Sequence, residues 1–202
     1  GFDGINLDFE NIYREDKDKL TRFVSRIAAA LHEQGVVVSL DVTVPQGSDT
    51  WSQCYDRKSL AAAVDYVMVM TYDETWRSSL RSGSVASLNW VERGLRDTLA
   101  EVPAEKLLLG LPFYMREWEE PADGQGPAKA TTLSMPDAER KIKEKNLTLQ
   151  WLEDKGQYYT EYYEQDKRYR IWLEDERSIA AKVALVGPYR LAGVTGAENH
   201  LF

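Results

Sequence analysis

The chain opens on a strictly alternating stretch, Asp3-Gly4-Ile5-Asn6-Leu7-Asp8-Phe9-Glu10. Successive side chains of a β-strand point to opposite faces, so this spacing puts Ile5, Leu7 and Phe9 on one face. The other face receives three polar side chains, those of Asn6, Asp8 and Glu10. The stretch therefore predicts a β-strand whose polar face ends in two carboxylic acids.

Further along the chain, apolar runs alternate with amphipathic helices. Strands are predicted over residues 36–44, 66–72, 106–112 and 191–195, and helices over 15–34, 56–63, 88–99 and 177–186. Strands of this apolar kind, separated by helices, are typical of a parallel sheet covered by helices. Together with the opening strand these make five strand–helix units, whereas a closed (β/α)₈ barrel has eight. The sheet is therefore either open or part of a barrel that lacks its first three units.

The segment from Pro121 to Glu174 interrupts this rhythm. It has a lead rich in Gly and Pro, a helix of mixed charge, and three stretches with strand character, at 148–152, 158–164 and 168–173. We predict a small α+β insertion before the last helix. The predicted domains are 1–120 (barrel units four to seven), 121–174 (the insertion) and 175–202 (the last helix and strand).

Composition narrows the class of protein. The 202 residues are 43% hydrophobic and carry a net charge of −8 without a basic cluster, which disfavours nucleic acid as a partner. The single cysteine, Cys54, allows no intrachain disulfide. No apolar run is long enough to predict a membrane span. The start at Gly1, directly before a strand, suggests a processed or cut fragment.

The carboxyl pair points to acid–base chemistry. Two neighbouring carboxyls in a shielded site do not both ionise easily, so one of them keeps a proton at a raised pKa and can act as a general acid. Glu10 stands last, at the carboxyl end of the strand, where barrel active sites lie. The alternative is an edge strand with its polar face in water. The apolar character of the other strands favours the shielded site.

These residues resemble glycoside hydrolase family 18, the chitinase-like family. Asp3-Gly4-x-Asn6-x-Asp8-x-Glu10 is similar to the Asp-Gly-x-Asp-x-Asp-x-Glu motif of the family's fourth barrel strand. Met70-Thr71-Tyr72-Asp73 resembles the end of strand six, and Gly110-Leu111-Pro112-Phe113-Tyr114 the end of strand seven. The finer resemblance is to bacterial spore-cortex-lytic and spore-germination glycosylases. It implies a partial TIM (β/α)₈ barrel containing strands four to eight.

The resemblance implies a retaining mechanism in which the substrate's own 2-acetamido oxygen attacks the anomeric carbon. Glu10 would protonate the leaving oxygen and then activate water. Asp8 would orient the acetamido group, and Asn6 would hold Asp8 without adding a charge. Tyr72 would donate its hydroxyl to the acetamido oxygen. Further expected substrate contacts are Asp73, Met70, Trp76, Tyr114 and Trp118. Met70 could instead pack inside the barrel. The three aromatic residues could either stack on sugar rings or anchor loops.

The sequence departs from the family in three places. The first three strands are missing, the last strand, 193–198, lacks the tryptophan that usually floors the subsite of the reacting sugar, and Met115 stands where glycine is usual. The exposed edges of an incomplete barrel predict a partner chain, a homo-oligomer or residual disorder that covers them.

Three hypotheses about function remain. The first is an enzyme that cleaves β-1,4 linkages of N-acetylglucosamine-containing glycan, either peptidoglycan or chitin, outside the cytoplasm at the envelope or spore. The second is a non-catalytic glycan-binding relative. The third is an unrelated α/β protein with magnesium at Asp8 and Glu10, which the absence of a phosphate-binding Gly-rich loop disfavours. The first implies no cofactor and no metal.

Overall fold

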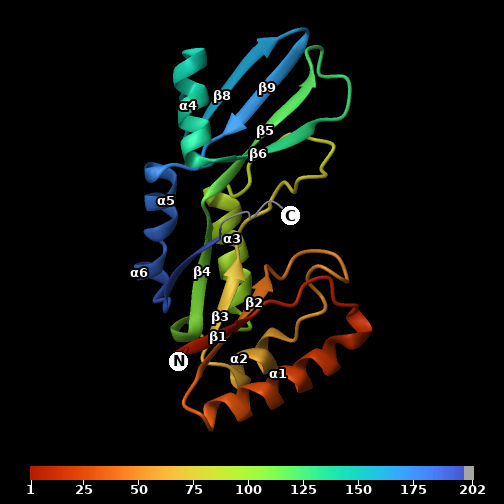
Figure 1. Ribbon diagram of the computed structural model, residues 1–202, viewed down its shortest axis with the longest axis vertical. Coiled ribbons are helices and arrows are strands. Elements are labelled where there is room, and N and C mark those ends of the chain that lie inside the picture. The colour runs from red at the N-terminus through yellow and green to blue at the C-terminus, as the bar shows by residue number, and fades with distance from the viewer. Residues whose placement is uncertain (198–202) are drawn as a thin grey trace. The chain divides into compact units, whose positions relative to one another are not determined.

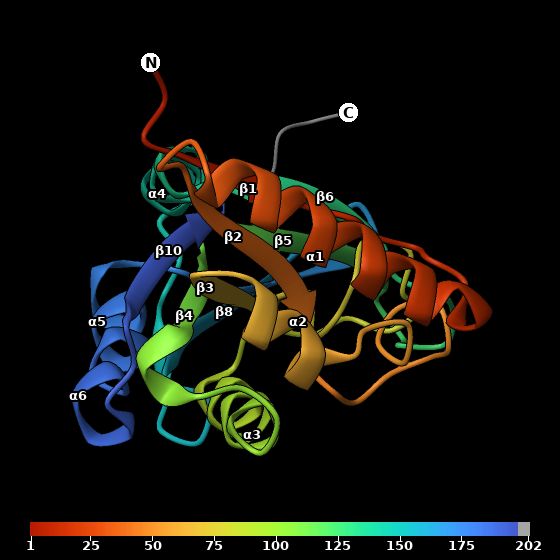
Figure 2. The same cartoon turned by 90° about the horizontal axis from the view of Figure 1, so that it is seen from below.

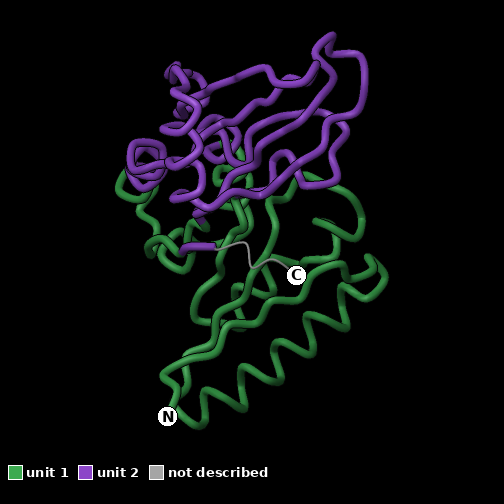
Figure 3. The backbone as a smooth tube through the Cα atoms, turned by 45° about the horizontal axis from the view of Figure 1, so that its top comes forward, with its two compact units in different colours: residues 1–71, 93–110, 186–195 green, residues 72–92, 111–185, 196–202 purple. Residues whose placement is uncertain are grey.

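The computed structural model describes residues 1–197. This part of the chain divides into two compact units, coloured separately in Figure 3. Unit 1 comprises Gly1–Thr71, Arg93–Gly110 and Val186–Thr195. Unit 2 comprises Tyr72–Glu92, Leu111–Leu185 and the last two described residues. Residues 198–202 lie outside the described residues. They include the last residue of the predicted strand 193–198 and the end of the predicted domain 175–202.

The predicted strand–helix alternation produces one curled sheet. Its five strands are β1 (Gly4–Leu7), β2 (Val37–Thr43), β3 (Tyr66–Met70), β4 (Leu107–Pro112) and β10 (Gly193–Ala197), in the order β1-β2-β3-β4-β10. The pairs β1–β2, β2–β3 and β3–β4 are parallel. Figure 2 shows the strands following one another round an arc. This half-barrel confirms the predicted α/β fold and partial TIM barrel.

Two helices pack beside the first strands of unit 1. α1 (Lys17–His32) contacts both β2 and α2 (Arg57–Ala63). It buries Leu20 and Val24, but Phe23 is 46% exposed. Asp56 directly precedes α2, and its carboxylate accepts a hydrogen bond from the Ser59 N–H and so caps the helix. The remaining helices here are α3 (Leu88–Leu99), which spans both units, α6 (Val186–Tyr189) and the 3₁₀ turns Arg14–Asp16 and Ala104–Lys106.

Unit 2 is built on an antiparallel sheet. Its strands are β5 (Tyr114–Pro121), β6 (Lys129–Ser134), β7 (Gln150–Leu152), β8 (Gln157–Glu164) and β9 (Lys167–Trp172), in the order β6-β5-β9-β8-β7, accompanied by α4 (Met135–Lys145) and α5 (Glu176–Val183) (Figure 1). The three later strands match the predicted ones. β5 and β6 were not predicted, so this sheet begins at Tyr114, ahead of Pro121.

A buried polar network holds α5 within unit 2. Glu174 and Lys182 are both completely buried, with 2.8 Å between Lys182 Nζ and Glu174 Oε2. Ser178 Oγ and Gln157 Nε2 each donate a further hydrogen bond of 2.7 Å to this carboxylate. A buried charge of this kind is tolerated because it is paired and fully hydrogen-bonded.

Candidate active site

The polar face of the first strand forms, but it is open. β1 ends at Leu7, and Asp8 and Glu10 follow it at its carboxyl end. Asn6, Asp8 and Glu10 are all exposed. Within this chain the prediction of a shielded cleft is therefore wrong, because β1 is an edge strand of the sheet. Directly after Glu10 the chain turns at Asn11, with a left-handed φ of 56°, a conformation that asparagine tolerates.

Asn6 is tied to the neighbouring strand. The two strands are in register at Asn6 and Ser39, and Ser39 Oγ donates a hydrogen bond of 2.6 Å to Asn6 Oδ1. Two positions further along β2 lies Asp41, which is only 4% exposed. Strand alternation puts Ser39 and Asp41 on the same face as Asn6. The polar face of β1 thus continues onto β2 and ends there in a buried carboxyl group.

Two carboxyls of this group have raised pKa values. Burial raises the pKa of Asp41 to about 7; a hydrogen bond with Asn6 opposes this rise, and the negative charges of Asp8 and Glu10 add to it. Partial desolvation also raises the pKa of Asp8, although its side chain is still accessible to water. The predicted proton sharing among the carboxyls at this strand end therefore extends to Asp41, a residue of the next strand.

Buried side chains hold the backbone around Glu10. The Tyr55 hydroxyl donates a hydrogen bond of 2.7 Å to the carbonyl of Phe9. Tyr55 is almost fully buried, and burial raises the pKa of its hydroxyl, so it remains a hydrogen-bond donor at working pH. The Arg57 guanidinium lies 5.6 Å from the centre of the Tyr55 ring and donates to the carbonyl of Thr43. This arrangement fixes the loop in which Glu10 sits.

Unit 2 holds the residues predicted at the end of the third strand. Asp73 follows Tyr72 and has a left-handed φ of 62°. Its Oδ1 accepts hydrogen bonds from the Tyr114 hydroxyl at 2.6 Å and from Arg116 Nη1 at 2.8 Å. The Tyr72 and Tyr114 rings meet edge to face, 6.3 Å between centres. Tyr114 and the buried Arg116 thus fix Asp73, and the Tyr114 ring packs against Tyr72.

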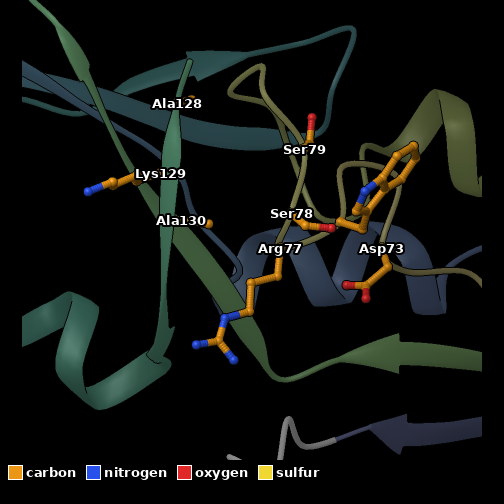
Figure 4. A pocket seen from close by; sticks show the side chains of 8 residues that line it. Asp73, Arg77, Ser78, Ser79, Ala128, Lys129 and Ala130 are labelled. Carbon is orange, nitrogen blue, oxygen red and sulfur yellow. The ribbon is translucent and has the colours of Figure 1, made fainter.

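An open pocket lies beside Asp73 in unit 2. It has a volume of 610 Å³, and its lining includes Trp76, Arg77 and Lys129. Figure 4 shows Asp73 and Arg77 on the loop after β3, and Lys129 at the start of β6. Trp76 is 58% exposed, so its ring is accessible to a ligand. This pocket combines one exposed aromatic ring with charged groups of both signs.

Three predicted substrate contacts turn out to be buried. Trp118 is completely buried and donates its indole N–H to the carbonyl of Gly83, so of its two expected roles sugar stacking is wrong and anchoring of the loop that contains Gly83 fits. Tyr114, only 6% exposed, anchors Asp73 and offers no ring face to a sugar. Met70 is also buried and serves packing. Of the aromatic candidates, Trp76 alone keeps an accessible ring.

Two charged residues of these side-chain groups were not predicted from the sequence, Asp41 beside Asn6 and Arg116 beside Asp73. Asp41 interrupts the apolar run of β2, and this single charge was the signal that could have revealed it. Arg116 belongs to β5, a strand that was not predicted. Among residues 1–197, no group of three or more His, Cys, Asp or Glu side chains is arranged to hold a metal. Within the same residues, no helix combines the length and the apolar character needed to cross a bilayer.

A half-barrel with Asp8 and Glu10 at the C-terminal end of its first strand is the arrangement of a glycosidase with a (β/α)₈ barrel. The model of "Glycosyl hydrolases family 18" matches residues 1–196. The chain therefore belongs to glycoside hydrolase family 18.

Relatives and solved structures agree with this assignment. The chain is 28% identical to the uncharacterized glycosylase YvbX of Bacillus subtilis, over 95% of this chain and 56% of that protein. It is 27% identical to the cortical fragment-lytic enzyme of B. subtilis, over 96% of this chain and 46% of that protein. The crystal structure of a Chromobacterium violaceum chitinase superimposes with a TM-score of 0.88 and 29% identity, over 98% of this chain and 61% of that one. The chain thus spans about half the length of the curated relatives it matches.

Proposed function

We propose that the protein carrying this chain hydrolyses β-1,4 linkages of N-acetylglucosamine-containing glycan, with Glu10 as its catalytic acid. Glu10 protonates the leaving glycosidic oxygen while the acetamido oxygen of the substrate attacks the anomeric carbon. Glu10 then takes a proton from the water that opens the cyclic intermediate, so the anomeric configuration is retained. The chemistry needs no metal or cofactor.

A single observation carries this proposal: Asp8 and Glu10 follow a parallel strand of a family 18 half-barrel at its carboxyl end, the end where barrel enzymes bear their catalytic groups. In the proposed mechanism Asp8 orients the acetamido group and stabilises the positive intermediate. Its raised pKa places it among carboxyls that compete for protons. Asn6 accepts a hydrogen bond from Ser39 and shares another with Asp41. In the proposed mechanism its uncharged amide also holds Asp8.

Unit 2 supplies the remaining proposed roles. Tyr72 donates its hydroxyl to the acetamido oxygen, a hydrogen bond that strengthens as charge develops on that oxygen. Asp73 accepts from a sugar hydroxyl, and its orientation is set by Tyr114 and Arg116. Trp76 stacks on a sugar ring from the wall of the 610 Å³ pocket.

We propose the glycan of the cell wall or spore cortex as substrate, with chitin as the alternative. The names of the relatives support this choice, because they include a cortical fragment-lytic enzyme and a putative sporulation-specific glycosylase alongside chitinases. Such a substrate lies outside the cytoplasm, at the envelope or spore. Comparison of hydrolysis rates on purified cortex glycan and on chitooligosaccharides decides between the two.

The proposal is tested with the full-length protein and its Glu10→Gln variant. Wild type should release oligosaccharides from one of the two glycans, and Glu10→Gln should lower this rate by at least roughly 10²-fold, the usual contribution of a general acid. Glu15→Gln, a change of the same kind at an exposed residue of the following 3₁₀ turn, should leave it unaltered. Equal rates in wild type and Glu10→Gln would remove Glu10 from the mechanism.

A glycan-binding protein without turnover is the second candidate. It is favoured by the composition of β10, Gly193–Ala197, which contains no tryptophan to hold the reacting sugar. Calorimetric titration of the full-length protein with chitooligosaccharide separates the two. Binding without any hydrolysis, unaltered by Glu10→Gln, would favour the binding protein over the enzyme.

A further inference from the structure

Asp41 is a buried carboxyl group of unit 1. It lies in the middle of β2 and is 4% exposed. Its Oδ1 has no hydrogen-bond partner among the described residues. In the same unit the buried Arg57 guanidinium is satisfied by backbone groups, since it donates to the carbonyl of Thr43 at 2.9 Å. A half-satisfied carboxyl in the interior is costly and calls for an explanation.

Asn6 connects Asp41 to the strand that carries the proposed catalytic residues. Ser39 Oγ donates to Asn6 Oδ1, which fixes the orientation of the amide. The Asn6 amide nitrogen is therefore the group that donates to the Asp41 carboxyl in the hydrogen bond between these two side chains. A chain of side chains thus runs from Ser39 through Asn6 to Asp41.

The charges that act on Asp41 are both negative. They belong to Asp8 and Glu10, at the end of β1. On the other side of β2, the residue in register with Asp41 is the uncharged Met68, and the titratable Tyr66 is in register with Ser39. The next residues of β2, Leu40 and Val42, are fully buried and point to the opposite face. Asp41 is thus the third carboxyl of one acidic group.

We propose that Asp41 is a positioning residue of the active site, whose charge, held beside Asp8 and Glu10 through Asn6, sets the upper pH limit at which Glu10 keeps its proton. This inference rests on the proposed function of Glu10. When Asp41 loses its proton, a further negative charge appears beside Glu10. A like charge disfavours ionisation, so Glu10 remains a competent acid to higher pH than it would alone.

Burial brings the ionisation of Asp41 close to neutral pH. The pKa of Asp41 is raised to about 7, so the group is neutral in mildly acidic solution and ionises as the solution becomes alkaline. The extra charge thus appears on the alkaline side of neutrality, beside Glu10. Interactions between close carboxyls of this kind shift each other's pKa by roughly half a unit or more.

The first test is the pH profile of kcat/KM for the full-length protein on the glycan that it cleaves. In Asp41→Asn the alkaline limb should move to lower pH by roughly half a unit or more. Asp18→Asn removes one negative charge from an exposed position of α1 and should leave the limb in place. A uniform loss of rate with an unmoved limb would mean that Asp41 is merely structural, and would overturn the proposal.

The second test needs neither turnover nor an Asp41 variant. Carbon-13 NMR of labelled aspartate in the full-length protein follows the titration of the Asp41 carboxyl. The midpoint should lie near pH 7 in wild type and fall in Asp8→Asn and in Glu10→Gln, because each change removes a neighbouring negative charge. A midpoint near that of free aspartate, or one that neither variant moves, would overturn the inference. If wild type cleaves no glycan, the proposed function fails, while this titration still decides whether Asp41 is coupled to Glu10.

Discussion

At the scale of single residues, burial makes the ionisation of a carboxyl depend on the fold, and Asp41 is the clearest case. Its folded pKa of about 7 lies above the value of 3.8 for an aspartate in an unfolded chain. The folded state therefore holds the proton more tightly. As pH rises between these values, the unfolded state loses its proton first, and the folded state becomes relatively less stable.

Asp41→Asn should accordingly stabilise the full-length protein in alkaline solution. The gain over wild type should be smallest near pH 4, grow as pH rises, and level off above pH 7 at a value on the order of 4 kcal/mol, which corresponds to the rise of the Asp41 pKa from 3.8 to about 7. Thermal unfolding of both proteins at pH 4.5, 6 and 8 measures it. A stability difference that stays constant across this range would mean that Asp41 has an ordinary pKa.

Residues of the site differ in how far the sequence could reveal them. Asn6, Asp8 and Glu10 could be found because strict alternation alone puts them on one face. Asp41 could be noticed as a single charge in an apolar run, but its place beside them could not be predicted, because it follows from the register of β1 on β2, which no local pattern contains. The sequence left two roles open for Trp118, because its burial against Ala128 and Trp172 is decided by the pairing of distant strands.

At the scale of elements, the two sheets show which strands a sequence can predict. Strands of the parallel sheet were predictable because they are apolar runs. β5 was not, because Arg116, Glu117, Glu119 and Glu120 lie within it. Partners elsewhere in unit 2 neutralise these charges: Lys141 Nζ lies 2.6 Å from Glu117, and Lys167 Nζ 2.8 Å from Glu119. A strand of this kind is stable only after the tertiary pairing exists.

The buried Glu174–Lys182 pair gives a prediction for α5. Lys182→Met leaves the Glu174 carboxylate buried without its cation, which should cost roughly 3–5 kcal/mol of stability. The double variant Lys182→Met/Glu174→Gln removes both charges and should recover most of that loss. Chemical denaturation of the full-length protein measures both. A double variant no more stable than the single one would show that the pair is not what holds α5.

At the scale of the whole molecule, the chain contains a half-barrel. The chain spans about half the length of its curated relatives. β1 is an edge strand, and apolar side chains beside it are exposed, with Phe2 at 90% and Val37 at 43%. The prediction that another chain or another copy covers this edge remains a prediction. The openness of Asp8 and Glu10 has the same cause, since an edge strand has a neighbour on one side only.

The central claim is that Glu10 is the acid that protonates the leaving group. An acid is needed for a sugar leaving group and hardly needed for dinitrophenolate, which departs without a proton. The most direct measurement is the first-turnover rate of full-length Glu10→Gln relative to wild type on two substrates, an unmodified N-acetylglucosamine oligosaccharide and its dinitrophenyl glycoside. The account predicts a loss of at least roughly 10²-fold on the first and a much smaller loss on the second. Equal losses on both substrates, or no loss on either, would contradict it.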